Sequence, residues 1–134
     1  MFFKTLLCDL LNIEYPLIQG AMAWIAGGNL AAAVSQAGGL GVIGASGAEP
    51  AWIKQEIEQV RKLTGKPFGV NLMLAAPGIE KVIELIIQEK VPVVTTGGGN
   101  PGPYMERLKA AGIKVIPVVA SVALARRLSR LGAD

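Results

Sequence analysis

The sequence contains no histidine and only one cysteine, Cys8. Histidine is the usual general acid or base near neutral pH, so its absence excludes Ser–His and Cys–His pairs and the common zinc-ligand sets within this chain. One cysteine allows no internal disulfide, which fits a reducing cytoplasm. We expect Cys8 to be a buried structural residue, because no base can be named beside it.

Charged side chains are also scarce, at 17% of 134 residues, and none occurs between Glu14 and Glu49. This uncharged stretch does not predict a membrane-spanning helix, because glycines and polar residues divide it into strand, helix and strand. The N-terminus does not resemble a signal peptide, because Asp9 interrupts its short apolar run. The net charge is +3, but the sequence has no motif of interleaved basic and aromatic residues of the kind that binds nucleic acid. We therefore expect a cytoplasmic protein that binds neither membrane nor nucleic acid.

Apolar residues, in contrast, make up 51% of the chain and fall into five successive strand–loop–helix units. A short strand is expected to begin Tyr15–Met22, and further strands are expected at Leu40–Ile43, Phe68–Met73, Val91–Thr95 and Lys114–Val119. A helix follows each strand. Asn29 and Ser121 are the expected caps of the first and last of these helices, and Pro50 is expected at the first position of the second. Residues 1–14 form an amphipathic lead-in to a domain of residues 15–134.

The alternation of strands and helices predicts an α/β fold with a parallel sheet. Five units allow either a complete five-stranded doubly wound sheet or the first five βα units of a (β/α)8 TIM barrel. The length of the chain favours the doubly wound sheet. The final residues Gly132–Asp134 favour the barrel, because they are typical of a turn into a further strand. We therefore expect a truncated TIM barrel, an incomplete copy of a larger domain.

Both architectures bring the loops that follow the strands to one rim, where ligands bind. The rim residues are Gln19–Met22, Gly44–Gly47, Asn71–Met73 and Thr95–Asn100. They offer backbone N–H groups, carboxamides and hydroxyls, but no carboxylate pair and no metal-ligand set, which suits a neutral, planar ligand. Asn71 needs a partner, because burying an unpaired amide costs about 1–3 kcal/mol. That partner is either another part of the protein or a ligand ring.

Several separate blocks of the sequence resemble the nitronate monooxygenase superfamily of FMN-dependent barrels. These blocks are YPLIQGAMA at 15–23, AGGLGVIG at 37–44 and KPFGVNLM at 66–73. Within that superfamily, VVTTGGGNP at 93–101 and GIKVIPVVASVALA at 112–125 are most similar to the flavin-dependent enoyl-acyl-carrier-protein reductases of bacterial type II fatty acid synthesis. The resemblance covers essentially the whole chain, but only the N-terminal half of the family's domain.

The resemblance implies that FMN lies across the carboxyl ends of the barrel strands. Backbone atoms of Gly20, Ala21 and Met22 would follow the isoalloxazine, and Asn71 would hydrogen-bond to the ring. The full set of expected cofactor-binding residues is Gly20, Ala21, Met22, Gly44, Asn71 and Thr96. No catalytic residue and no metal site is expected in this segment. The family's phosphate-binding loops and the histidine associated with reduction lie beyond the fifth unit.

The implied reaction is FMN-dependent reduction of a trans-2-enoyl-acyl-carrier-protein thioester by NADH or NADPH, although this segment alone is expected to be inactive. One alternative is a nitronate monooxygenase, which uses FMN and oxygen without nicotinamide. Another is a non-catalytic α/β binding module. A truncated barrel would also expose edge strands and its apolar interior, so we expect either a homodimer or pairing with a complementing second fragment.

Overall fold

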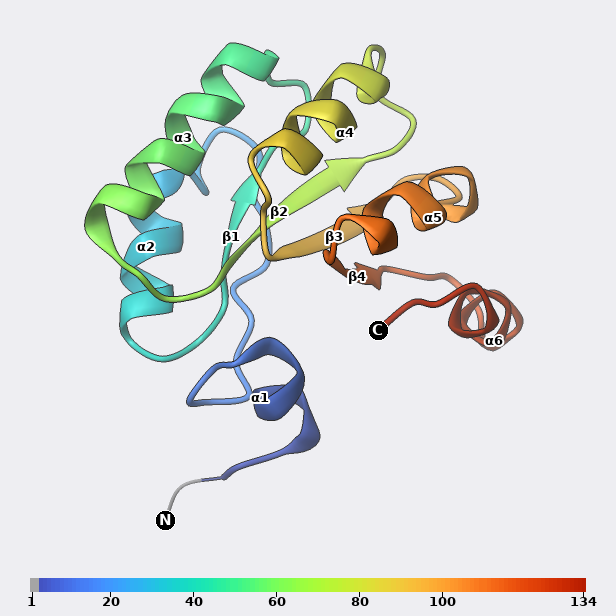
Figure 1. The fold of residues 1–134 in the computed structure, drawn as a ribbon, viewed down its shortest axis with the longest axis horizontal. Helices are drawn as coiled ribbons and strands as arrows, with labels where there is room; N and C mark the ends of the chain where they lie inside the picture. The colour runs from blue at the N-terminus through green and yellow to red at the C-terminus, as the bar shows by residue number, and fades with distance from the viewer. Residues whose placement is uncertain (1–2) are drawn as a thin grey trace.

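The computed structural model describes residues 3–134. Four strands, all parallel to their neighbours, form one sheet in the order β1-β2-β3-β4 (Figure 1). They are β1 Gly41–Gly44, β2 Phe68–Met73, β3 Val93–Gly97 and β4 Lys114–Pro117. This order contains no reversal, whereas a doubly wound sheet changes direction at a switch point. The sheet is therefore part of a TIM-barrel wall, and the doubly wound alternative is wrong.

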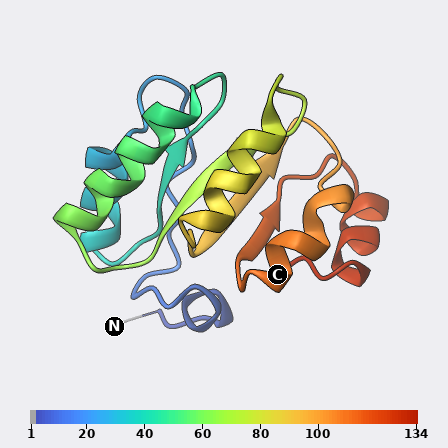
Figure 2. The ribbon, with the colours of Figure 1, turned by 45° about the horizontal axis from the view of Figure 1, so that its top comes forward.

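Six helices accompany these strands within the described residues. They are α1 Leu6–Leu11, α2 Gly28–Gln36, α3 Pro50–Leu63, α4 Ile79–Gln88, α5 Gly102–Ala110 and α6 Val122–Arg130. Figure 2 shows α3, α4 and α5 in sequence over one face of the sheet. Helix α1 lies at the end of the sheet opposite to the arrowheads of the strands (Figure 1). None of the helices in residues 3–134 is long and apolar enough to cross a membrane.

The two faces of the sheet are buried in different ways. A row of apolar side chains at matching register positions packs against the helices, and all its members are at most 1% exposed: Ile43, Val70, Val94 and Val115. On the opposite face, Val42 and Val93 pack with Cys8 and Leu11 of α1. Cys8 is buried, as predicted. Helix α1 therefore closes the amino-terminal end of this second face.

The first predicted strand, in Tyr15–Met22, is wrong in extent, because only one parallel bridge forms, between Ile18 and Leu40. The Gln19 side chain explains the difference. Its Oε1 accepts a hydrogen bond from Val42 N at 3.1 Å, and its Nε2 donates to Val42 O at 3.2 Å. These two bonds replace the backbone pairing that a longer strand would make, so the main chain is free to turn from Gly20 onward.

Helix α2 packs closely on β1 and begins without a side-chain cap of its own. The predicted cap, Asn29, is wrong, because the N-cap residue is Gly27. The carboxylate Oε2 of Glu56, on α3, accepts the hydrogen bond from Gly28 N instead. A Cβ atom on Gly41 would lie 1.9 Å from Ala31 O, so the close packing of the helix on the strand requires glycine at position 41.

The segment after α6 returns to the sheet. Asp134 N donates to Val115 O at 3.0 Å, and the Asp134 carboxylate accepts from Val115 N at 2.8 Å. The same carboxylate pairs with Lys109, and lies 3.5 Å from Lys114. Burial acts to raise the pKa of the Asp134 carboxyl, but the hydrogen bonds from Lys109 and Val115 outweigh it, and the pKa is lowered. Residues 132–134 therefore turn back toward the sheet, where Asp134 makes main-chain contact with β4.

Candidate functional site

A row of residues near the carboxyl ends of the strands carries the polar side chains of the uncovered face. The register pairs Gly44 with Asn71 and Asn71 with Thr95. Asn71 Nδ2 donates to Thr95 Oγ1 at 2.8 Å, and both residues are half-buried. A carboxamide offers two hydrogens and one oxygen. Within residues 3–134 the bond to Thr95 engages one hydrogen, which leaves the other hydrogen and the oxygen for a ligand.

The loop that follows the Ile18 bridge lies directly against the end of β1. The carbonyl oxygen of Met22 accepts hydrogen bonds from Ile25 N and Ala26 N at 3.1 and 2.8 Å, and Ala26 O accepts from Gly44 N at 2.8 Å. A Cβ atom on Gly44 would lie 2.8 Å from Met22 O and 2.9 Å from Met22 C. The loop backbone can therefore reach the strand end only because position 44 is glycine.

The space around this row is open and free of formal charge. A Cβ atom added at Gly20 or at Gly97 would meet no other atom within 4 Å. Ala21 is partly buried and packs beside the cluster that α1 covers. No ionisable side chain occurs among Gln19–Met22, Gly44, Asn71 and Thr95–Gly97. The rim therefore offers hydrogen-bonding groups and room without an acid, a base or a charge.

The two adjacent threonines of β3 lie on opposite faces of the sheet. Thr96 is 1% exposed on the helix-covered face, and its carbonyl oxygen accepts a hydrogen bond from Val118 N at 2.7 Å. Thr95 presents its hydroxyl on the face of Asn71. The expected cofactor-binding residues included Asn71 and Thr96, whose roles remain predictions, but not Thr95, the hydrogen-bond partner of Asn71. Strand periodicity of two predicts that the threonines diverge, but only the register shows which one faces Asn71.

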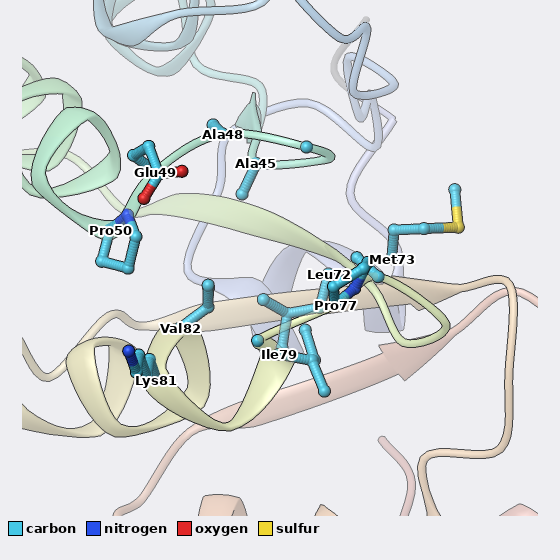
Figure 3. Close-up of a pocket in the computed structure, with 13 residues that line it drawn as sticks. Ala45, Ala48, Glu49, Pro50, Leu72, Met73, Pro77, Ile79, Lys81 and Val82 are labelled. Carbon is cyan, nitrogen blue, oxygen red and sulfur yellow. The ribbon is translucent and has the colours of Figure 1, made fainter.

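A cavity of ≈ 410 Å³ lies beyond the rim, between the loop after β1 and the start of α4. Figure 3 shows Ala45, Glu49 and Pro50 on one side of this cavity and Lys81 and Val82 on the other. Its walls include Leu72, which belongs to the helix-covered face of β2. The cavity is therefore separate from the row of Asn71 and Thr95.

The site contains no metal-binding group: no three His, Cys, Asp or Glu side chains of the described residues are arranged to hold an ion. The fold and the rim together define a barrel-type protein whose strand-end rim offers hydrogen-bonding groups and no ionisable side chain. Residues 4–82 match the family model described as nitronate monooxygenase. The chain belongs to this family, whose members are oxidoreductases and in general depend on flavin.

Comparison with individual proteins extends the likeness over the whole chain. The structure of FabK from Thermotoga maritima superposes with a TM-score of 0.96 at 51% identity, over 98% of this chain and 42% of that one. A (3aS,4S,5R,7aS)-5-hydroxy-7a-methyl-1-oxo-octahydro-1H-indene-4-carboxyl-CoA dehydrogenase of Mycobacterium tuberculosis is 36% identical over 100% of this chain and 38% of its own length. A probable nitronate monooxygenase of Staphylococcus aureus is 34% identical over 100% of this chain and 48% of its own length. The chain thus spans less than half the length of these relatives.

Proposed function

We propose that the chain forms the flavin-facing rim of an FMN-dependent reductase that reduces trans-2-enoyl-acyl-carrier-protein thioesters with NADH or NADPH. The observation that carries this proposal is the 51% identity to FabK, an enoyl-acyl-carrier-protein reductase, over 98% of the chain. The name of the M. tuberculosis relative also describes an acyl thioester, a carboxyl-CoA, which supports a thioester as the substrate class. Because this chain covers less than half of each relative, the activity is proposed for the whole enzyme.

The residues of the rim fit a flavin. The ring system is planar and carries both donors and acceptors, and the Asn71 carboxamide has one of each left after its bond to Thr95. The backbone of Gly20–Met22 would border the ring, and the missing side chain of Gly44 keeps that backbone against the strand end. The open space at Gly20 and Gly97 leaves room for a flat group.

When bound, FMN would supply the redox chemistry, accepting hydride from the nicotinamide and passing hydride to the β-carbon of the thioester. The residues of this chain have other tasks. Thr95 fixes the orientation of the Asn71 carboxamide, and Asn71 in turn orients its ligand. Cys8 and Leu11 of helix α1 cover the amino-terminal end of the same sheet face, away from the rim. They exclude water from that end of the site. No described residue of the rim has a side chain that titrates near neutral pH, so a proton for the α-carbon must come from elsewhere.

The test is the oxidation of NADH and NADPH by the FMN-loaded protein expressed from the intact gene, with and without a crotonyl thioester. We expect oxidation that depends on the thioester. Binding of FMN to the 134-residue chain, monitored by the quenching of flavin fluorescence, tests the rim separately. Thioester-independent oxidation, or none, would remove the reductase proposal.

A nitronate monooxygenase is the second candidate, favoured by the family description and by the S. aureus relative. It would consume a nitronate and oxygen without any nicotinamide. The same preparation therefore separates the two enzymes when it is supplied with a nitronate in place of NAD(P)H and thioester. A non-catalytic binding module, the third alternative, would bind no FMN and turn over neither substrate.

The proposed partners are acyl carrier protein, as the carrier of the substrate, and a second copy or a complementing fragment of the barrel. Large apolar side chains on and around α6 are exposed, including Val118 at 71% and Val122 at 69%. Uncovered apolar surface of this kind favours association. Sedimentation of the purified chain over a range of concentrations would measure it.

A further inference from the structure

We propose that a cleft between Trp24 and Trp52 binds the acyl chain of the thioester, an inference that rests on the function proposed above. The cleft has a volume of ≈ 220 Å³ and is lined by Trp24, Gly44, Ser46, Gly47, Ala48, Glu49 and Trp52. Gly44 belongs both to this lining and to the row that contains Asn71. The cleft therefore opens directly beside the proposed position of the flavin.

Trp24 is held in an unusual position on the rim. Trp24 is 84% exposed, and its φ of +67° lies in the left-handed region, which is strained for a bulky residue. The turn is nevertheless fixed, because Met22 O accepts hydrogen bonds from both Ile25 N and Ala26 N. Strain that is maintained in this way is common at ligand sites. The tryptophan is thus kept out of the core and at the mouth of the cleft.

Trp52 forms the opposite wall on a rigid support. It lies in the first turn of α3, two residues after Pro50, and is partly buried against the main hydrophobic core. One wall of the cleft is therefore part of the packed domain, whereas the other is an exposed side chain on a turn. Such an arrangement can admit a flexible ligand between two aromatic surfaces without unfolding either element.

The lining of the cleft selects the apolar part of the substrate. Glu49 is its only ionisable residue, and a carboxylate disfavours the phosphates of a nicotinamide dinucleotide or of a phosphopantetheine arm. The remaining walls are aromatic rings, glycine, alanine and one serine. A volume of ≈ 220 Å³ is well above that of a single water site, so the cleft accommodates a short run of methylenes. An uncharged acyl chain is the part of an enoyl thioester that meets these conditions.

The experiment measures binding of uncharged N-acetylcysteamine thioesters, from crotonyl to decenoyl, by isothermal titration calorimetry. We expect Kd to fall by up to about fourfold per added methylene until the cleft is filled. Trp24→Ala should flatten this dependence. Ile25→Ala is the matched control, because Ile25 is 70% exposed on the same turn but does not line the cleft. Trp24 and Trp52 are the only tryptophans of the chain, so their fluorescence should change during each wild-type titration.

A second variant, Ser46→Leu, fills the cleft from another side and should weaken binding of the long thioesters while sparing crotonyl. A Kd that does not depend on chain length, or a Trp24→Ala dependence equal to that of the wild type, would overturn the proposed cleft. If either of these binding results is found together with thioester-dependent turnover, the reductase proposal is retained and only the acyl-chain cleft is rejected. Chain-length-dependent binding that Trp24→Ala abolishes supports the cleft, even in a protein that fails the turnover assay and so loses the reductase assignment.

Discussion

Asn71 and Thr95 form a hydrogen-bonded pair across β2 and β3, with Nδ2 of the carboxamide 2.8 Å from the threonine hydroxyl. The pair is fixed by the strand register, because the two residues are direct partners in the ladder. The Asn71 carboxamide is therefore oriented before any ligand arrives, which reduces the entropy lost on binding.

The first prediction concerns this pair. Asn71→Ala should weaken FMN binding by roughly tenfold, which corresponds to one hydrogen bond of about 1–1.5 kcal/mol. Thr95→Val should have a smaller effect in the same direction, because the carboxamide remains but is no longer oriented. Thr95→Ser retains the hydroxyl and serves as the control. Titration of FMN fluorescence gives all four affinities, and a Thr95→Ser variant as weak as Thr95→Val would contradict the role of the hydroxyl.

The second prediction separates the two rim glycines. Gly44→Ala should lower the free energy of unfolding by about 1–3 kcal/mol, because its Cβ would meet the Met22 main chain at 2.8 Å. Gly20→Ala has open space at the same atom and should leave stability nearly unchanged. Urea unfolding followed by circular dichroism measures both. Equal stability of the two variants would show that the loop can move away from β1 at little cost.

The third prediction concerns the start of α2. Because Glu56 accepts the hydrogen bond from Gly28 N in place of a local cap, Glu56→Ala should destabilise the protein by about 1 kcal/mol. Glu58→Ala is the matched control: Glu58 lies at an exposed position of α3, the helix that also carries Glu56, and its loss should change stability little. The comparison is made by thermal unfolding, and a Glu56→Ala variant as stable as Glu58→Ala would show that water caps the helix equally well.

The fourth prediction is a pH dependence. The folded-state pKa of Asp134 is lowered from its ordinary value of 3.8. Its contribution to stability is therefore complete above that value and is lost as the pH falls through the lower folded-state pKa. Asp134→Asn should cost about 1 kcal/mol at neutral pH and should remove this part of the acid sensitivity.

The control for the fourth prediction is Asp9→Asn, which breaks an exposed ion pair with Lys4 at 2.8 Å. Side chains that are 59% and 74% exposed gain little from such a pair, so the acid unfolding curve should barely change. Acid titration of all three proteins, monitored by circular dichroism, provides the measurement. An unchanged acid transition in Asp134→Asn would assign the sensitivity to other carboxyls.

Local signals in the sequence predicted several elements closely. Strand Phe68–Met73 has the predicted bounds, Pro50 begins α3, and Ser121 caps α6 by accepting a hydrogen bond from Leu124 N at 3.2 Å. Each of these features depends on neighbouring residues alone. A proline at the first helical turn and a serine before an amphipathic run have the same meaning in most folds.

The errors occur where a distant residue decides the outcome. Gln19 replaces backbone pairing with its side chain, and Glu56 reaches from α3 to cap α2 in place of Asn29. Neither contact leaves a local trace in the sequence. The pairing of Asn71 with Thr95 likewise requires the register between two strands that are 24 residues apart.

The contact between Gly44 and Met22 involves main-chain atoms of both residues, so it does not depend on which side chain occupies position 22. The Met22 side chain is 41% exposed, and its neighbours Trp24 and Ile25 are more exposed still. Side chains at positions 22 and 24 can therefore change the surface of the rim while the polypeptide path beside β1 is preserved. Divergence toward new substrates can thus proceed through one surface residue at a time, provided that glycine is retained at position 44.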